Sequence, residues 1–468
     1  MKKDLEIKIG FFTIGLQAYW AQMKDMKPEI EGYAEVIINR LSFFGEVINA
    51  GIIDNTLDAR KTEELFIKED IDILIIHVGT YGLSSTVAAC IRRLQVPIIT
   101  LHLQPIESFK KDTQAEYALP KNVFSAAGEI GAALNRMGRK FYPIFGQLKN
   151  DERPWEVLQD FLAASKIKKK LRNSNVGLIG NVYAGMADIY ADGLLFINKL
   201  GINLEIFEIG NLRHFIEKVS EIEAEEKLKS IKEKFIFDFD AKKEHELLLW
   251  NAKVAVGLEK FAKYNELDAI AYHYSGYPQT MAQKIGYSMT VGGALLASEG
   301  IACAEEGDLF SAISILILQM ICKNATQAEF KVADFKEGVN YLEHTGPGNI
   351  CMSPDKPILK LMKYFHGKSG SGFSCQFNIE EGPITLLSLT AQKDNSLKLL
   401  IAEGLSVSGT MLEDGEMCAR IRFKKGIVDF AEKWMLAGPS HHSALGTGFN
   451  ENKLIRTAQI LDLNYEII

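Results

Sequence analysis

Short apolar segments alternate with longer amphipathic segments over the first part of the chain. Residues 7–12, 73–78 and 97–102 are apolar runs of strand length, and the stretches at 27–44 and 85–94 carry apolar positions at helical spacing. Buried strands that alternate with helices are typical of a parallel sheet with helices on both of its faces. We therefore predict an α/β protein whose first domain is a doubly wound, Rossmann-like parallel sheet.

The same alternation returns after a charged helical stretch at residues 156–172. Apolar runs at 176–180, 204–209 and 269–273 predict strands of a second parallel sheet, and the charged stretch at 216–234 predicts a solvated helix. The two regions share this pattern without a convincing sequence repeat. The second region is therefore predicted to be another doubly wound, Rossmann-like α/β domain.

The pattern changes from about residue 346 onwards. Apolar segments are separated there by turns that contain Gly, Asp and Asn, which is typical of antiparallel strands, and these segments lie at 373–377, 384–389 and 397–401. We therefore expect three domains: an N-terminal α/β domain at 1–172, a central α/β domain at 173–343, and a C-terminal antiparallel β-rich, barrel-like domain at 344–468.

The composition is that of a soluble globular protein, and the charge distribution argues against nucleic acid as a partner. Hydrophobic residues make up 47% and charged residues 24% of the chain, which suits packed domains with solvated surfaces. The formal net charge is −7 and cationic residues are spread along the chain, whereas nucleic-acid binders concentrate them on one face. The six cysteines form no C-x-x-C pair, which argues against a zinc-finger type of site. We expect no nucleic-acid partner.

One long apolar segment, residues 309–322, raises the question of a membrane span. It is too short to cross a bilayer comfortably and contains Ser and Gln, so we expect a buried helix. No apolar stretch of signal-peptide type precedes the first predicted strand. The sequence therefore predicts a cytoplasmic protein without membrane contact.

Carboxylates and imidazoles occur together in widely separated segments. His441 and His442 are adjacent and follow a Gly-Pro-Ser turn, Glu306 lies in an E-E-G-D segment, and Asp334 and His344 lie between these two. Oxygen and nitrogen donors that converge from distant segments can hold a divalent metal ion beside catalytic oxygens. The chain alone therefore suggests a metal-dependent enzyme.

Each of these residues also has a structural interpretation. Glu305 and Glu306 could be solvated residues that favour the start of the next helix, for which Asp308 is a plausible N-cap. Asp334 could lie in a surface turn, and a single histidine before a turn, such as His344, is more often structural. The chain lacks a G-x-x-x-x-G-K-[ST] phosphate loop, a good G-x-G-x-x-G segment after a strand and a G-x-S-x-G nucleophile elbow. ATP, NAD and serine-hydrolase chemistry are therefore not indicated.

Several segments, in the same order, resemble the L-arabinose isomerase and L-fucose isomerase superfamily. Residues 15–20 (G-L-Q-A-Y-W) resemble its G-x-Q-x-[LY]-Y substrate loop, and residues 101–104 (L-H-L-Q) resemble its F-H-x-Q strand end. The E-E-G-D segment at 305–308 is similar to G-E-G-D of the arabinose branch and to C-E-V-D of the fucose branch. The closest match is W-M-L-A-G-P-S-H-H-S at 434–443, which resembles W-I-L-A-G-G-A-H-H-T.

The resemblance implies an aldose–ketose isomerase, an intramolecular oxidoreductase that interconverts a pentose or 6-deoxyhexose and its ketose through a cis-enediol. It places catalysis and metal binding on Glu306 and Asp334, and it completes the metal site with His344 and His442. Asp334 rests on a looser match of V-A-D-F to the family's F-M-E-D segment. The implied ion is Mn²⁺, which Co²⁺ or Ni²⁺ could replace. The family also implies homotrimers or homohexamers in which the N-terminal domain of one subunit completes a neighbour's site.

Contacts with the sugar are expected at Gln17, Tyr19 and His441. Two segments depart from the arabinose pattern: N-V-F-S-A-A-G at 122–128 replaces N-Q-T-A-H-G-G, and G-N-V-Y at 180–183 replaces G-D-N-M. Large aromatic side chains are expected to shape the pocket instead, namely those of Trp20, Tyr81 and Tyr183. Two alternatives stay open: a catalytically inactive sugar-binding or regulatory protein on the same fold, and a different metal-dependent carbohydrate enzyme such as an epimerase.

Overall fold

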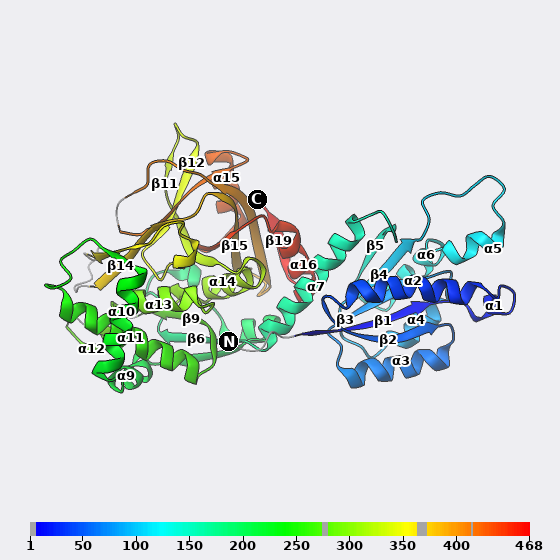
Figure 1. Ribbon diagram of the computed structural model, residues 1–468, viewed down its shortest axis with the longest axis horizontal. Coiled ribbons are helices and arrows are strands. Elements are labelled where there is room, and N and C mark those ends of the chain that lie inside the picture. Colours follow the sequence, from blue (N-terminus) through cyan, green and yellow to red (C-terminus); the bar gives the residue numbers. More distant parts are fainter. Residues whose placement is uncertain (1–5, 274–278, 363–371, 413–414) are drawn as a thin grey trace. The chain divides into compact units, whose positions relative to one another are not determined.

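The computed structural model describes residues 6–273, 279–362, 372–412 and 415–468 (Figure 1). The chain forms two compact units, Met1–Lys170 and Leu171–Ile468, and helix α7 (Arg153–Arg172) runs across the boundary between them. Within the described residues, the first unit contains one sheet and the second unit contains two.

The first unit is a parallel sheet with helices on both faces. Its strands follow the order β2-β1-β3-β4-β5. They are β1 (Ile7–Ile14), β2 (Gly45–Ile53), β3 (Ile73–Val78), β4 (Ile98–Gln104) and β5 (Phe141–Gln147). The helices are α1 (Gln17–Trp20), α2 (Met26–Leu41), α3 (Thr56–Glu69), α4 (Ser84–Ile91), α5 (Ala115–Ala118), η1 (Leu119–Lys121) and α6 (Ser125–Arg136). Every residue of β3 is buried, as expected where helices cover both faces, and Figure 1 shows α2 and α3 on opposite sides of the sheet.

The strand order of this sheet reverses between β1 and β3. In open α/β sheets, ligands bind outside the carboxyl ends of the strands at such a switch point. Gln17 follows the end of β1 and Tyr81 follows the end of β3, so two of the predicted sugar contacts lie at this edge.

A second parallel sheet carries the elements that lead into the candidate site. Its order is β10-β9-β6-β7, and its strands are β6 (Asn175–Gly180), β7 (Asn203–Phe207), β9 (Leu267–His273) and β10 (Ala302–Glu305). Its helices are η2 (Ala187–Ile189), α8 (Gly193–Leu200), α9 (Ile209–Glu217), α10 (Glu221–Lys234), α11 (His245–Tyr264), α12 (Met281–Gly286), α13 (Met289–Ser298) and α14 (Leu309–Cys322). Leu309 to Leu318 of α14 are buried, which confirms the buried helix expected from the apolar run.

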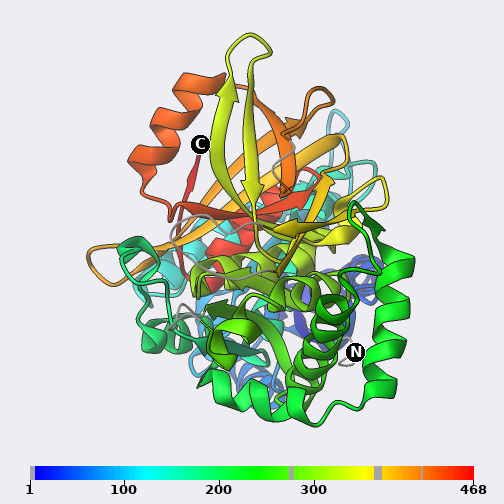
Figure 2. The same ribbon diagram turned by 90° about the vertical axis from the view of Figure 1, so that its left-hand side faces the viewer.

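The remaining strands form a mixed, largely antiparallel sheet. Its order is β19-β16-β15-β18-β11-β12-β17-β14-β13-β8, and β16 also pairs with β17, so the strands from β16 to β17 close into a ring. The strands are β8 (Ile236–Phe237), β11 (Ala325–Asp334), β12 (Val339–His344), β13 (Ile358–Met362), β14 (Gly372–Asn378), β15 (Gly382–Ala391), β16 (Leu397–Ser406), β17 (Met417–Phe423), β18 (His442–Thr447) and β19 (Asn464–Ile467). Helices η3 (Ile350–Met352), α15 (Ile427–Ala437) and α16 (Glu451–Leu461) accompany them. Figure 2 shows the hairpin of β11 and β12 projecting from this sheet.

The predicted fold class is confirmed, with two helix-covered parallel sheets and an antiparallel β-rich region. Strands β11 and β12 begin before residue 344 and already belong to the ring. The three predicted domain ranges stay a prediction.

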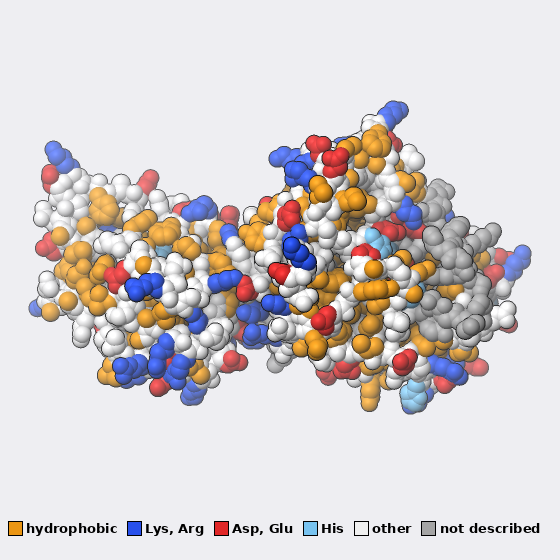
Figure 3. All heavy atoms as spheres, turned by 180° about the vertical axis from the view of Figure 1, so that it is seen from behind, with side chains coloured by type: hydrophobic (Ala, Val, Ile, Leu, Met, Phe, Trp, Pro, Cys, Tyr) orange, Lys and Arg blue, Asp and Glu red, His pale blue; other side chains and the backbone are white. Residues whose placement is uncertain are grey.

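The surface and the helices bear on the expected partners. On the face shown in Figure 3, cationic and acidic side chains are interspersed. Among the residues that the structure describes, no helix combines the length and apolar character needed to cross a membrane.

Candidate functional site

The turn between β10 and α14 holds Glu306 in an unusual backbone conformation. Glu306 has a φ of 65° and Gly307 has a φ of 74°, so two consecutive residues are left-handed. For a residue with a side chain, such a conformation costs about 1–3 kcal/mol, and residues of this kind cluster at functional sites. A Cβ atom at position 307 would lie 2.4 Å from the carbonyl oxygen of Asn181, so glycine is required there. The backbone thus marks Glu306 as a candidate functional residue.

Asp308 begins helix α14 and also binds a histidine. Its carboxylate accepts the amide hydrogen of Ser311 at 3.1 Å and the hydroxyl of Ser311 at 2.6 Å, which confirms the predicted N-cap. Its Oδ2 atom also lies 3.0 Å from Nδ1 of His442. Because Asp308 is fully buried, this contact holds the His442 ring in one orientation and leaves Nε2 facing away from Asp308.

His442 opens β18 and stands between two carboxylates. Its Nε2 atom lies 3.3 Å from Oε2 of Glu306, while Nδ1 faces Asp308. Burial opposes the charged ring, but hydrogen bonds with Asp308 and Glu306 raise the pKa of His442 to about 10. Burial also opposes the charged form of Glu306, yet contacts with His441 and His442 hold the pKa of this carboxyl well below its usual range. The site therefore favours a positive charge between its carboxylates.

His344 ends β12 and lies beside His442. The two Nε2 atoms are 3.1 Å apart. Nδ1 of His344 accepts the amide hydrogen of Gly346 at 2.9 Å, so the neutral ring carries its proton on Nε2. Burial, followed by the charge of His442, lowers the pKa of His344 to about 3. Coordination of an ion through Nε2 would require this proton to move to Nδ1 and the contact with Gly346 to be given up.

His441 directly precedes β18 and is held by a second aspartate. Oδ2 of Asp188, from helix η2, lies 2.9 Å from the backbone nitrogen of His441 and 2.6 Å from its Nδ1 atom. The other ring nitrogen, Nε2, lies 3.7 Å from Oε2 of Glu306. Contact with Glu306 raises the pKa of His441 although burial opposes this, and Asp188 adds to the effect. Asp188 was not predicted from the sequence, where no local pattern connects it with His441.

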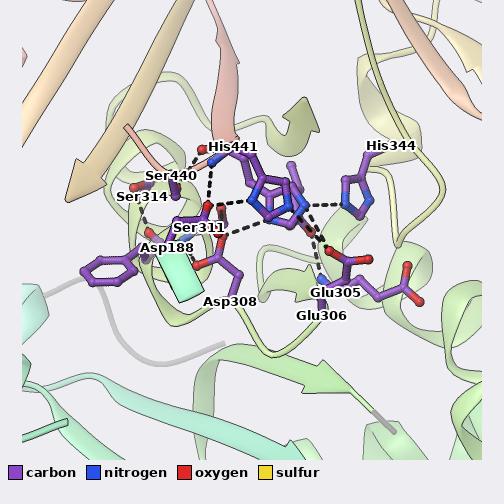
Figure 4. A network of polar contacts seen from close by, with 12 residues as sticks. Asp188, Glu305, Glu306, Asp308, Ser311, Ser314, His344, Ser440 and His441 are labelled. Carbon is purple, nitrogen blue, oxygen red and sulfur yellow. Dashed lines mark hydrogen bonds and ion pairs between the residues drawn. The ribbon is translucent and has the colours of Figure 1, made fainter. Parts of the chain in front are cut away.

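Glu306, His441 and His442 can offer ligand atoms to one ion. Their candidate ligand atoms lie within 4.8 Å of one another. Figure 4 shows the carboxylates and imidazoles of this network turned toward each other. Carboxylate oxygen and imidazole nitrogen suit Mn²⁺, Co²⁺ and Ni²⁺. A divalent ion therefore fits the donor set, and it would supply the positive charge that the carboxylates favour.

Strand register brings a further carboxylate, Glu329, to the same face. Glu329 of β11 lies directly opposite His442 of β18 and directly opposite Glu343 of β12. Opposed residues in antiparallel strands project from the same face of a sheet. Glu329 was not among the residues predicted from the sequence. The available signal is the alternation of Gln327 and Glu329 around Ala328, which places both polar side chains on one face.

The structure places Asp334 at the far end of β11, where the chain turns into β12. Its Oδ1 atom accepts the amide hydrogens of Lys336 and Glu337, both at 2.9 Å. These contacts match the structural interpretation of Asp334 as a turn residue. At a rise of about 3.3 Å per strand residue, Asp334 lies about 16 Å along the strand from Glu329. The hairpin thus keeps Asp334 away from the residues around His442.

Tyr183 is a predicted sugar contact that reaches the site. Its amide hydrogen is donated to the carbonyl oxygen of Glu306 at 2.9 Å. Its ring packs against His273 with ring centroids 4.6 Å apart. The loop after β6 is thereby joined to the strained turn that carries Glu306.

The other predicted sugar contacts lie in the first unit. Gln17 is exposed at the start of α1, and Tyr19 is half-buried. The indole nitrogen of Trp20 donates to Oδ2 of Asp54 at 2.7 Å, and the hydroxyl of Tyr81 donates to Oε2 of Glu129 at 2.6 Å. The role of these four residues in binding a substrate stays a prediction.

Comparisons with known proteins bear on the family. Residues 194–324 match the family model of the L-arabinose isomerase central domain. The chain is 23% identical to the L-arabinose isomerase of Thermotoga neapolitana, over 99% of this chain and 95% of that protein. It is 21% identical to the L-arabinose isomerase of Oceanobacillus iheyensis, over 99% of each chain. Among solved structures, a sugar-binding protein of a Legionella pneumophila ABC transporter matches 65% of this chain over its own full length. Its sequence identity is 10%, and its TM-score of 0.13 is too low to indicate a shared fold. The relatives confirm the resemblance to L-arabinose isomerases.

Proposed function

We propose that this chain, which is similar to L-arabinose isomerases over nearly its whole length, is an aldose–ketose isomerase that acts with a divalent metal ion. The observation that carries the proposal is the position of His442 between Asp308 and Glu306, next to His441. Carboxylates and imidazoles that converge in this way can hold a cation beside two oxygens of a reacting sugar. The proposed substrate class is a pentose or a 6-deoxyhexose.

The proposed ligand set combines Glu306 and His442 with a second carboxylate. Glu329 suits that role because its side chain shares a face with His442, whereas Asp334 binds the amides of a turn farther along the same strand. His344 is the further nitrogen donor at this position. The proposed ion is Mn²⁺, with Co²⁺ or Ni²⁺ as substitutes. When bound, such an ion would polarise the C1 and C2 oxygens of the sugar and offset negative charge on them.

Carboxylates of the chain would move the proton between C1 and C2. The contacts that lower the pKa of Glu306 keep it ionised at neutral pH, so it can accept the proton from C2 of the aldose. Glu306 would return this proton to C1 of the cis-enediol, and Glu329 would carry the hydroxyl proton of O2 to O1, so that the ketose forms and both carboxylates end as they began. Asp308 holds the His442 ring so that Nε2 faces Glu306 during these steps.

Further parts of the proposal concern the sugar and the assembly. Tyr183 and His441 in the second unit are proposed to contact the sugar. Four residues of the first unit are proposed to contact the sugar bound by a neighbouring subunit, namely Gln17, Tyr19, Trp20 and Tyr81. We also propose a homotrimer or homohexamer and a cytoplasmic location.

The experiment is a reconstitution with a panel of sugars. Metal-stripped protein is supplied with Mn²⁺, Co²⁺ or Ni²⁺ and incubated with pentoses and 6-deoxyhexoses, and ketose formation is measured for wild type and Glu306→Gln. We expect metal-dependent ketose from at least one aldose, and its loss in the variant. Sugar binding without any ketose would favour the inactive sugar-binding alternative, and an epimeric aldose as product would favour an epimerase.

A further inference from the structure

The loop between β6 and α8, residues 181–192, reaches the candidate site at two points. Near its start, the amide of Tyr183 donates to the carbonyl of Glu306 at 2.9 Å. Farther along, the carboxylate of Asp188 contacts His441. The first contact holds the loop against the turn of Glu306, and the second holds the segment that leads into β18. Figure 4 shows Asp188 and His441 joined in this network.

A single oxygen of Asp188 fixes both the backbone and the ring of His441. Oδ2 accepts the backbone amide hydrogen at 2.9 Å and lies 2.6 Å from Nδ1, a short contact of the kind that a charged acceptor favours. With Nδ1 engaged, Nε2 is the ring nitrogen left to face a ligand. It lies 3.7 Å from Oε2 of Glu306, which is too long for a direct hydrogen bond but places both atoms on the same side.

The adjacent histidine is held in the same way. Nδ1 of His442 faces Asp308, and its Nε2 faces Glu306 at 3.3 Å. The two aspartates differ in their other tasks, because Asp308 is also the N-cap of α14, whereas Asp188 lies within η2, whose N-cap is Met186. The Asp188 side chain is also 41% exposed, so its place is not explained by burial in a core. The contacts with His441 are therefore the feature of Asp188 that points to a role in the site.

We propose that Asp188 is a positioning residue that presents Nε2 of His441 to a hydroxyl group of the sugar. The geometry rests on the contacts of Asp188, and the identity of the ligand rests on the proposed isomerase function. A hydroxyl can donate or accept a hydrogen bond, so it suits the ring nitrogen that Asp188 leaves exposed. Without Asp188, the ring can turn about its side-chain bonds and exchange tautomers, and the contact with the sugar is weakened.

The first test measures the ring itself and needs no turnover. The full-length, metal-free protein is labelled with ¹⁵N-histidine, and the His441 signal is assigned from its absence in His441→Gln. At a pH high enough to leave the ring neutral, we expect wild type to carry the proton on Nδ1, and Asp188→Ala to show a mixture of tautomers. Asp188→Asn, which keeps one acceptor oxygen, should lie between the two and guards against a folding defect in Asp188→Ala. An unchanged His441 signal in both variants would overturn the positioning role.

The second test is a double-mutant cycle on kcat/KM with Asp188→Ala, His441→Ala and the pair. We expect Asp188→Ala to lower kcat/KM by about 10- to 100-fold, the usual effect of an orienting residue. The double variant should be no slower than His441→Ala, because Asp188 acts through His441. If the losses of kcat/KM in the two single variants multiply in the double variant, Asp188 acts independently of His441, which would contradict the proposal. Asp192→Asn is the matched control in the same loop, since Asn can keep the N-cap contact with Leu194.

The two tests separate failure of this inference from failure of the proposed function. A wild-type protein that converts no sugar would refute the isomerase function, while the tautomer of His441 would still report on Asp188. An active wild type with an unaltered His441 ring in both Asp188 variants would refute the positioning role alone.

Discussion

Each unit buries histidines near strand ends, but their surroundings differ in charge. In the first unit, Nδ1 of His77 lies 3.1 Å from the hydroxyl of Thr13. His102 bonds the carbonyl oxygen of Val123 at 2.8 Å and stacks on Phe145 with ring centroids 4.3 Å apart. Burial, followed by the effect of His102, lowers the pKa of His77 to about 3, and burial also lowers the pKa of His102. Burial beside partners without charge thus keeps both rings neutral.

In the second unit, the adjacent histidines meet carboxylates instead. His441 contacts Asp188, and His442 lies between Asp308 and Glu306. The pKa of His442 is raised to about 10 against the effect of burial, and that of His441 is raised as well. The comparison teaches that burial alone makes histidine a neutral packing residue, whereas opposed carboxylates create a place for a proton or a metal ion.

The largest expected effect on activity concerns Glu329, the second carboxylate of the proposed metal site. We expect Glu329→Gln to lower kcat by about 10²- to 10⁴-fold, the usual contribution of a positioned acid or base. Asp334→Asn is the control on the same strand, because Asn can still accept the amide hydrogens of the turn, and it should change kcat by no more than about twofold. Steady-state kinetics of the two variants checks this. The reverse order of effects would restore the role that the sequence resemblance gave to Asp334.

The next largest effect concerns Asp308, the aspartate that contacts Nδ1 of His442. Asp308→Asn retains a good N-cap for α14 but removes the charge beside Nδ1 of His442. We expect Mn²⁺ affinity or kcat/KM to fall by about 10- to 100-fold while helix content is kept. Calorimetric titration with Mn²⁺ and circular dichroism measure the two quantities. A large loss of helix would show that Asp308 acts through folding rather than through His442.

The smallest effect concerns the neutral histidines. The folded-state pKa of His77 is about 3, below the ordinary value of 6.5, so the unfolded chain binds the extra proton as the pH falls below 6.5. The free energy of unfolding should therefore decrease from pH 6.5 downwards and level off near pH 3. Between pH 6.5 and 5, we expect His77 to account for about 2 kcal/mol of this decrease.

The variant His77→Gln provides the control for the pH effect. It lacks the titrating ring, so its unfolding free energy, measured in urea at several pH values, should depend less steeply on pH than that of wild type. Parallel curves for the two proteins would mean that His77 does not stay neutral in the folded state.

The order of elements and part of the site could be predicted from the sequence. Apolar runs separated by helical patterns gave the two parallel sheets, and the adjacent His441 and His442 with the E-E-G-D segment indicated the histidine and carboxylate positions. These signals are local, because they depend on a run of residues or on one short motif.

The remaining site residues depend on contacts between distant segments. The register of β11 and β18 places Glu329 beside His442. Asp188 contacts His441 from the loop after β6, a strand of a different sheet from β18. Asp308 could be predicted as a helix cap, but its second contact with His442 required the fold. The V-A-D-F match led to Asp334 instead of Glu329 on the same strand. Because each strand residue adds about 3.3 Å, this difference of position moves the carboxylate about 16 Å along the strand, away from His442.

The most direct test of the account is calorimetric titration of the metal-stripped chain with Mn²⁺. Wild type is compared with Glu306→Gln and His442→Gln in the second unit, and with His77→Gln and His102→Gln in the first. We predict a single Mn²⁺ per wild-type chain, a loss of at least about 100-fold in affinity in the first pair of variants, and unchanged affinity in the second pair. Absence of Mn²⁺ binding in wild type, or equal affinity in wild type and His442→Gln, would contradict a metal site between these carboxylates.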